Sequence, residues 1–273
     1  MPLAALGLAF GAAFLHAFWN VFLGRSRDVE AATAVVLVFS VVLFAPVAAF
    51  AGRVTWAAAP WIAASSALEL AYFALLAAGY RRSDVSLVYP VARGLAPIVV
   101  LIAAVAVGRA TSTGQVLGVF AVAVGVLLVR GLTRGADTRG LLFGLVIACC
   151  IAGYTLVDKE GIRHASPIPY LDLVLAGPAI VYLVAMVRLR GPNAVRAEVR
   201  PVNALLAAAG FGAYSLVLAA LQLAPAASVA AVRETSVVIA TVLAALVLRE
   251  RVTRVRLAGS VVVAGGIALL ALG

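Results

Sequence analysis

The sequence predicts an all-α integral membrane protein with ten transmembrane helices, arranged as two inverted five-helix repeats. Three observations lead to this fold class: the composition, the spacing of apolar segments, and the distribution of basic residues. Of the 273 residues, 65% are hydrophobic and only 12% are charged, and the mean hydropathy is +1.14. A soluble globular domain carries about twice that share of charged residues, so the composition alone indicates a membrane protein.

Apolar segments of about 20 residues, enough to cross about 30 Å of hydrocarbon, recur along the whole chain with short polar breaks. We predict helices, because a chain in lipid must satisfy its backbone hydrogen bonds internally and these runs are too long and uniform for barrel strands. The ten predicted segments comprise residues 3–24, 31–51, 57–80, 84–107, 113–130, 140–158, 167–188, 203–223, 226–248 and 254–272. Asp158, at the end of the sixth segment, is expected to mark the membrane interface.

The basic residues divide unequally between the two sides of the predicted bundle. Fifteen of the 21 lysines and arginines lie in or beside the odd-numbered connections, against four in the even-numbered ones. These four are Arg53, Arg109, Lys159 and Arg163. Because cytoplasmic loops carry the excess of positive charge, the odd connections are predicted to be cytoplasmic and both termini to lie outside.

Several other function classes lack support in the sequence. The net charge of +10 does not indicate nucleic-acid binding, because the basic residues form short clusters between apolar segments rather than one basic face. Cys149 and Cys150 are adjacent in an apolar segment, a spacing that suits no metal site. No nucleotide-binding or nucleophile motif occurs, so we expect no enzyme, no ATP-driven pump, no metal and no cofactor.

The fourth segment contains a charged residue, Arg93, near the middle of a membrane-length run. A charge at this depth is costly unless it faces the protein interior or a watery cavity, so Arg93 is a candidate site residue. Tyr89, four residues earlier, shares its helical face. Pro90 and Pro97 each lack a backbone donor, and Gly94 leaves room for a neighbouring backbone or a ligand. We therefore predict that these three residues let the helix bend.

An internal repeat becomes visible when the two halves are offset by about 141 residues. Tyr72 then aligns with Tyr214, and Arg93 lies near the position equivalent to Arg233. Because each half has five crossings, an odd number, the second half must enter the membrane in the opposite orientation, and a site is expected near the midplane between the halves. The predicted repeats span residues 1–135 and 136–273.

Two runs of the sequence carry a family resemblance: YPVARGLAP at 89–97 and VRETSVVIATVLAALVLRERVTRVRLAG at 232–259. Together with the five-plus-five layout, they resemble the EamA-type branch of the drug/metabolite transporter superfamily over essentially the whole chain. Residues 248–250, Leu-Arg-Glu, resemble the family's Leu-Gly-Glu-like corner, whereas 108–109, Gly-Arg, lacks the acid in the first half. The resemblance implies a membrane transporter. Many ten-helix members keep both termini in the cytoplasm, which conflicts with the arginine distribution here.

Arg93 and Arg233 are the main substrate-binding candidates. Repeat symmetry would bring both guanidinium groups to one central cavity, where they can bind a carboxylate, phosphate or phosphonate through paired hydrogen bonds. The alternative is a permanent ion pair, for which Glu69 and Glu234 are the available acids. Glu69 is also a candidate for proton coupling, as a carboxyl group that loads and releases a proton in an apolar site.

Two further groups of side chains complete the predicted site. His16 and Asn20 share one face of the first segment with Trp19 close by, and this face either lines the cavity or joins helices. His16 is the second proton-coupling candidate. Tyr72 and Tyr214 are candidates to cap the cavity, with plain packing as the alternative. The predicted substrate-binding residues are therefore Trp19, Asn20, Tyr72, Tyr89, Arg93, Tyr214, Arg233 and Glu234.

The predicted function is secondary active transport, by efflux or exchange, of a small anionic or zwitterionic metabolite such as an amino acid or organic acid. The alternatives are a flippase for a lipid-linked sugar and a membrane-embedded protein with a function other than transport. The expected partners are a small-molecule substrate, the lipid bilayer and a coupling proton, with no nucleic acid. We expect a monomer that crosses a bacterial-type inner (plasma) membrane many times.

Overall fold

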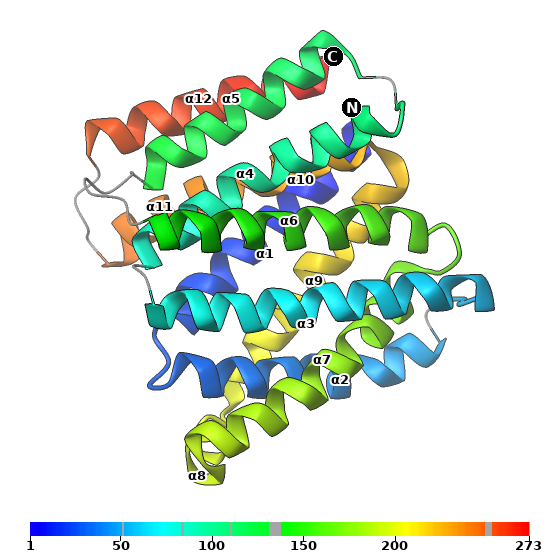
Figure 1. Cartoon of the computed structure of the whole chain (residues 1–273), viewed down its shortest axis with the longest axis vertical. Coiled ribbons are helices and arrows are strands. Elements are labelled where there is room, and N and C mark those ends of the chain that lie inside the picture. Colours follow the sequence, from blue (N-terminus) through cyan, green and yellow to red (C-terminus); the bar gives the residue numbers. More distant parts are fainter. Residues whose placement is uncertain (51, 83–84, 110, 131–137, 249–252, 273) are drawn as a thin grey trace.

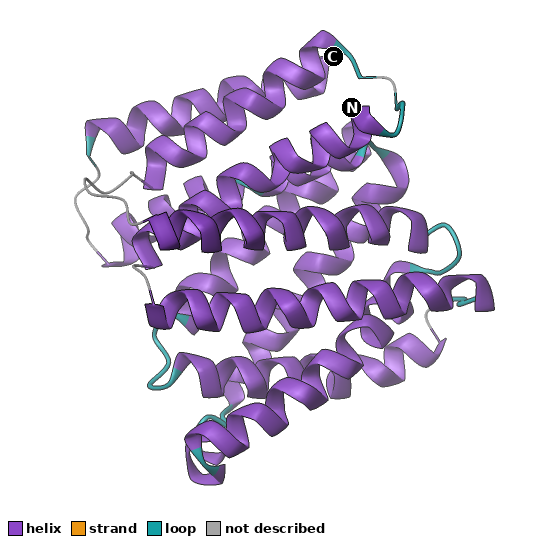
Figure 2. Ribbon diagram, in the orientation of Figure 1, coloured by secondary structure: helices purple, strands orange, loops and turns teal. Residues whose placement is uncertain are grey.

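The computed structural model describes every residue except 51, 83–84, 110, 131–137, 249–252 and 273. The described residues form helices joined by short loops, with no strand among them (Figure 2). In chain order the helices are α1 (Leu3–Leu23), α2 (Val29–Phe50), the 3-10 helix η1 (Trp56–Ala58), α3 (Ala59–Arg82), α4 (Val85–Ala106), α5 (Thr113–Arg130), α6 (Thr138–Gly161), α7 (Pro167–Arg190), α8 (Pro192–Ala197), α9 (Pro201–Leu223), α10 (Ala226–Arg233), α11 (Thr235–Leu248) and α12 (Arg254–Leu272).

Each of the ten predicted segments is helical over most of its described residues, and the short α8 is an addition that the sequence pattern did not predict. Seven described helices are long and apolar enough to cross a membrane, judged by length and composition. The apolar stretches Val91–Ala106 of α4 and Thr113–Val129 of α5 are shorter. These lengths fit a multi-pass membrane protein, while the count of ten crossings stays a prediction.

The ninth segment, predicted as one helix, is broken at Glu234 between α10 and α11. The backbone turns more tightly there: the amide of Glu234 donates to the carbonyl of Ala231 (3.1 Å), and that of Val237 donates to the carbonyl of Glu234 (3.0 Å). The hydroxyl of Thr235 donates to the carbonyl of Val232 (2.8 Å). A hydroxyl that takes a helical carbonyl competes with the regular backbone ladder, which accounts for the break.

The helices pack as pairs across the bundle: α5 with α12, α1 with α9, α2 with α7, and both α3 and α4 with α6. Figure 1 shows the α5–α12 pair at one extreme of the bundle and α2 with α7 near the other. The two termini lie at the same end of the helices, where the amino group of Met1 donates to the carbonyl of Leu270 (3.3 Å). An even number of crossings requires this arrangement.

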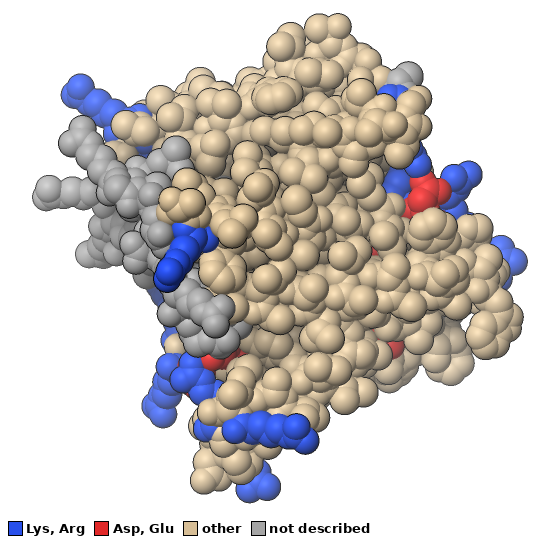
Figure 3. Space-filling model, in the orientation of Figure 1, with Lys and Arg blue, Asp and Glu red and all other residues tan. Residues whose placement is uncertain are grey.

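The flanks of the bundle expose large apolar side chains. Phe14, Ile102, Ile180 and Val261 are each more than half exposed. Figure 3 shows charged side chains at the ends of the helices and almost none on the flank between them. Water would not favour such a surface, whereas lipid tails would, so the flank is suited to contact with the hydrocarbon of a bilayer.

Candidate functional site

The interior of the bundle holds a cluster of two arginines and one glutamate. Arg93 comes from α4, Arg233 is the last residue of α10, and Glu234 lies at the break before α11. Their exposed fractions are only 4%, 1% and 0%. Glu234 lies between the arginines, with Oε2 at 3.2 Å from Nε of Arg93 and Oε1 at 3.6 Å from Nε of Arg233. The structure therefore brings three predicted site residues together.

This cluster carries more positive than negative charge. One carboxylate faces two guanidinium groups, so the three residues together hold one net positive charge. Nη2 of Arg233 is buried and has no hydrogen-bond acceptor among the described residues. A buried charged donor without an acceptor is unfavourable, so an additional anionic or carbonyl oxygen at this point would stabilise the cluster. The permanent ion pair considered above is present, but it leaves hydrogen-bonding capacity unused.

Glu69, in α3, is a second buried acid near this cluster. Its exposed fraction is 7%, and the ion pairs of Arg93 and Arg233 among the described residues are made with Glu234 and not with Glu69. The charge of Arg233 attracts its carboxylate and that of Asp158 repels it. Glu69 therefore does not bridge either arginine directly, contrary to one of the alternatives open from sequence.

Asp158 was expected at the membrane interface, and the structure corrects this prediction. It is fully buried in α6, which continues to Gly161 instead of ending at 158. The hydroxyl of Tyr170 donates to its Oδ1 (2.9 Å), and that of Tyr214 donates to its Oδ2 (2.5 Å). Asp158 thus joins α6 to α7 and α9. Asp158 lies four residues after Tyr154, so both share one helical face. This spacing was the sequence signal that Asp158 could face the interior.

A row of tyrosines connects the two predicted caps. The ring of Tyr154 lies between those of Tyr72 and Tyr214, with centroid distances of 6.2 Å and 5.9 Å in edge-to-face geometry. Because the hydroxyl of Tyr214 is engaged by Asp158, this residue serves packing and the buried acid at least as much as a cavity. Tyr154 is the central member of this row.

The predicted face of α1 separates into two parts. The rings of His16 and Trp19 form an edge-to-face pair with centroids 5.5 Å apart, and Trp19 packs over the backbone of Gly210 in α9. The charges of Arg93 and Arg233 act on His16, so this ring lies near the arginine cluster. Asn20 instead donates from Nδ2 to the carbonyl of His16 (2.7 Å), within its own helix.

The hinge residues of α4 are only partly described. α4 remains helical through Gly94 and Pro97, and both are buried. A Cβ atom on Gly94 would lie 3.1 Å from the side chain of Leu127, so the room left by this glycine is used by α5. The side chains of Tyr89 and Pro90 lie outside the described residues. Bending of the helix therefore stays a prediction.

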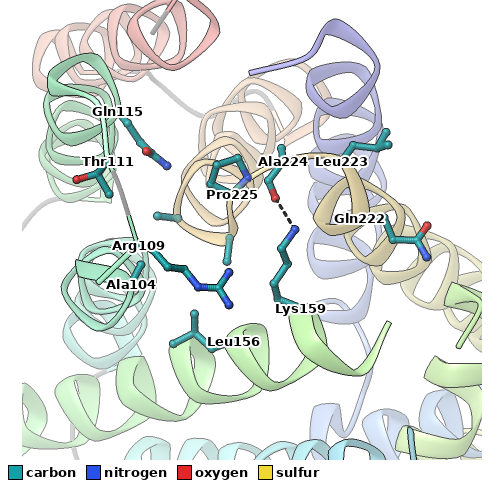
Figure 4. A pocket seen from close by; sticks show the side chains of 12 residues that line it. Ala104, Arg109, Thr111, Gln115, Leu156, Lys159, Gln222, Leu223, Ala224 and Pro225 are labelled. Carbon is teal, nitrogen blue, oxygen red and sulfur yellow. Dashed lines mark hydrogen bonds between the residues drawn. The ribbon is translucent and has the colours of Figure 1, made fainter. Parts of the chain in front are cut away.

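A cavity of about 330 Å³, lined by both polar and apolar side chains, lies where α4 and α6 end and α10 begins. Figure 4 shows Arg109, from the loop that follows α4, and Lys159, from α6, extending toward the same space. The sequence interpretation assigned no site role to either residue, because each lies near a predicted helix end where charges are common. Only the packing of the helix ends brings them together.

Comparison with known proteins adds two findings. Residues 138–272 match the family described as "EamA-like transporter family". A solved structure described only as "Crystal structure of protein" is similar to this chain with a TM-score of 0.79 and 15% identity, covering 100% of this chain and 98% of the other. No curated protein matches the sequence. At this identity the solved structure shows a shared fold, and the family match covers the half that contains Arg233 and Glu234.

Proposed function

We propose that this chain, which belongs to the EamA-like transporter family through residues 138–272, is a secondary transporter of a small anionic or zwitterionic metabolite, such as an amino acid or an organic acid. The observation that carries the proposal is the buried pair of Arg93 and Arg233 around the single carboxylate of Glu234. A carboxylate or phosphate group of a substrate would compensate the remaining positive charge and accept the unused hydrogen bonds.

Glu234 is expected to hold the two arginines together while no substrate is present. A substrate carboxylate is chemically equivalent to this side chain and competes with it for the same guanidinium donors. Because Glu234 lies at the break between α10 and α11, no continuous helical ladder holds its backbone, and a small rotation can withdraw the side chain. The substrate would then connect α4 of the first half to α10 of the second.

Residues 1–135 and 136–273 are proposed to be inverted repeats of five crossings each. The helix pairs support this assignment because they form equivalent sets. α1 packs on α9 as α6 packs on α3, and α2 packs on α9 as α7 packs on α3. The pairs α5–α12 and α2–α7 each join equivalent helices of the two halves. Rocking of one half against the other then gives alternating access to the arginine cluster.

Four glycines of α5 and α12 support the same symmetry at the level of residues. At the 141-residue offset, Gly118 is equivalent to Gly259 and Gly125 to Gly266. A Cβ atom on Gly118 would lie 2.8 Å from the carbonyl oxygen of Gly266, and one on Gly125 would lie 2.8 Å from that of Gly259. The repeat therefore relates the Gly118–Gly266 contact to the Gly259–Gly125 contact, as a two-fold axis relates two equivalent contacts.

Glu69 and His16 are the proposed sites of proton coupling. Glu69 is buried and His16 is partly buried, and the charge of Arg233 acts on each of them. When a substrate anion offsets that charge, proton binding at either residue becomes more favourable, which couples the two events. We further propose that the protein works as a monomer in a bacterial inner membrane, because one chain contains both halves.

The test is transport in proteoliposomes with labelled amino acids, organic acids and phosphonates, with and without a pH gradient. We expect wild type to move an anionic or zwitterionic solute and Arg93→Ala to abolish the movement. Because Arg93→Ala leaves Glu234 without one partner, the double variant Arg93→Gln/Glu234→Gln is the matched variant that preserves the net charge. A folded double variant that transports normally would refute the binding role of the arginine cluster.

The same experiment separates the main alternative. If folded wild-type protein moves no soluble solute but exchanges a fluorescent lipid-linked sugar between leaflets, the flippase is the better assignment. A pH gradient without effect on wild-type transport would remove the coupling proposal for Glu69 and His16, and would leave substrate exchange as the source of energy.

A further inference from the structure

The ends of α4, α6 and α9 border a region, lined by both polar and apolar side chains, that the proposed transport site does not use. Two adjacent cavities occur there, of about 330 Å³ and about 360 Å³. Arg109, Lys159 and Gln222 line both of them. We call these three residues and the two cavities the basic mouth. It lies at the end of the bundle that carries both termini (Figure 1).

The charges around the basic mouth do not cancel. Arg109 and Arg163 both pair with the single carboxylate of Glu160. Lys159 donates from Nζ to the carbonyl oxygens of Leu221 and Ala224, which are neutral acceptors. The charges of Arg109, Glu160 and Arg163 all act on Lys159. Three cations against one acid leave two positive charges around a space large enough for a small molecule.

The orientation of the side chains favours a ligand in this space. Figure 4 shows the guanidinium group of Arg109 and the ammonium group of Lys159 directed into the region between α4, α6 and the start of α10. Two cations repel each other, so their convergence is unfavourable unless an anion or solvent lies between them. Gln115, 8% exposed, also lines the cavity of about 330 Å³ and donates from Nε2 to Ser228 (3.0 Å).

The basic mouth is connected to the interior by α10. Ala226 and Ala227, in the first turn of α10, line the cavity of about 330 Å³, and Arg233 is the last residue of the same helix. Seven residues of α-helix cover about 10 Å. The mouth and the arginine cluster are thus two separate positive regions, joined along one short helix.

We infer that the basic mouth is a binding site for small anions of the carboxylate or phosphate class, distinct from the arginine cluster. That an anionic substrate binds in the basic mouth before it reaches the arginine cluster rests on the proposed function, whereas anion binding by itself does not. The two uncompensated charges also raise the local concentration of anions, an effect that salt weakens.

The experiment measures binding of inorganic phosphate by titration calorimetry to the whole protein in nanodiscs of phosphatidylcholine. The double variant Arg93→Gln/Arg233→Gln serves as the background, since it removes both arginines of the interior cluster. We expect phosphate binding to persist in this background. We expect Arg109→Gln and Lys159→Gln each to weaken it at least about tenfold, because each removes a charged hydrogen-bond donor.

Arg53→Gln is the matched control, since it removes one exposed arginine from the same end of the bundle, outside both cavities. Its phosphate affinity should equal that of the background. Lys159→Gln retains a donor for the carbonyl groups of α9, and melting temperatures check that each variant is folded. Unchanged affinity in folded Arg109→Gln and Lys159→Gln protein, or equal losses in Arg53→Gln, would overturn the inference.

A lipid headgroup offers the same phosphate chemistry as a free anion, so a second arm uses nanodiscs that contain phosphatidylglycerol. If phosphate binds more weakly in nanodiscs with phosphatidylglycerol than in those without it, and Arg109→Gln protein shows no difference between the two lipids, the site belongs to the headgroup of an anionic lipid. Equal binding in both lipids assigns it to a soluble anion. Either result supports an anion site in the basic mouth.

Transport distinguishes this inference from the proposed function. If both hold, Arg109→Gln raises the KM of anion transport and leaves kcat nearly unchanged, whereas Arg93→Ala abolishes transport. If the proposed function fails, wild type moves no anion while phosphate binding at the mouth persists. If the inference fails, transport is present and insensitive to Arg109→Gln.

Discussion

The arginine cluster and the basic mouth contain the same types of ionic group in different surroundings. Arg93 and Glu234 have side chains that are 5% and 0% exposed, whereas those of Arg109 and Glu160 are 48% and 24% exposed. An exposed pair is screened by water and salt and contributes little to stability. A buried pair cannot lose one partner without leaving an uncompensated charge in the interior. The comparison indicates that burial, more than the geometry of the contact, decides how much each ion pair contributes to stability.

This difference fits two different tasks. A buried cluster with unused donors can discriminate between ligands, because an unsuitable ligand leaves charged groups unsatisfied. An exposed cluster with excess charge can attract anions quickly, and it releases them easily because water competes for the same groups. We therefore expect substitutions in the two regions to differ in both stability and salt dependence.

The largest effect is expected for Glu234→Ala, which leaves Arg93 and Arg233 facing each other without an acid. Loss of one partner of a buried pair should lower the free energy of unfolding by about 3–5 kcal/mol. Denaturation in mixed detergent micelles measures this change. The double variant Arg93→Gln/Glu234→Gln keeps the net charge of the cluster and should recover part of the loss, because Arg233 then lacks an acid but no longer faces a second cation. If the free energy of unfolding of Glu234→Ala falls by less than about 1 kcal/mol, the buried cluster contributes no more to stability than an exposed pair, and the prediction is wrong.

An intermediate effect is expected for Asp158→Asn, which removes the charged acceptor for Tyr170 and Tyr214. Hydrogen bonds to charged groups contribute about 1.5–3 kcal/mol, so the free energy of unfolding should fall by about that amount. Asp172→Asn in α7 is the matched control, because Oδ1 of Asp172 has no hydrogen-bond partner among the described residues. Equal losses in the two variants would contradict a specific role for the two tyrosines.

The smallest effect is expected for Arg109→Gln, which breaks an exposed pair while Glu160 keeps Arg163. The free energy of unfolding should change by less than about 1 kcal/mol. Raising the salt from 0.1 M to 1 M shortens the Debye length from about 10 Å to about 3 Å and should abolish even this change. The loss in Glu234→Ala should persist at high salt, since the buried cluster is screened less. A salt-resistant loss in Arg109→Gln would contradict the contrast between the two regions.

Much of the helical organisation could be predicted from the sequence. All ten apolar segments are helical over most of their described residues, since length and hydrophobicity are local properties of the chain. Two features were not predicted: the break in the ninth segment and the continuation of α6 past residue 158. Thr235 engages a carbonyl and breaks the ninth segment, and α6 continues past Asp158 because residues up to Gly161 extend the helix.

The candidate site was predictable in part. The positions of Arg93 and Arg233 in the middle of apolar runs indicated buried charges, and Glu234 was available as a partner. The sequence could not decide which acid pairs with which arginine. Glu69 and Glu234 were both candidates, and only the packing of α4 against α10 selects Glu234. Tyr89 and Pro90 stay predictions, because their side chains lie outside the described residues.

The sequence by itself determined that the chain is helical and suited to a membrane, and that two arginines lie deep within it. Both conclusions follow from local hydrophobicity and from the cost of placing a charge in hydrocarbon. Only the tertiary structure decided that Asp158 binds two tyrosines and that Arg109 converges with Lys159. These contacts join helices that lie far apart in the chain, so their formation depends on how the helices pack and not on the spacing of residues within any one of them.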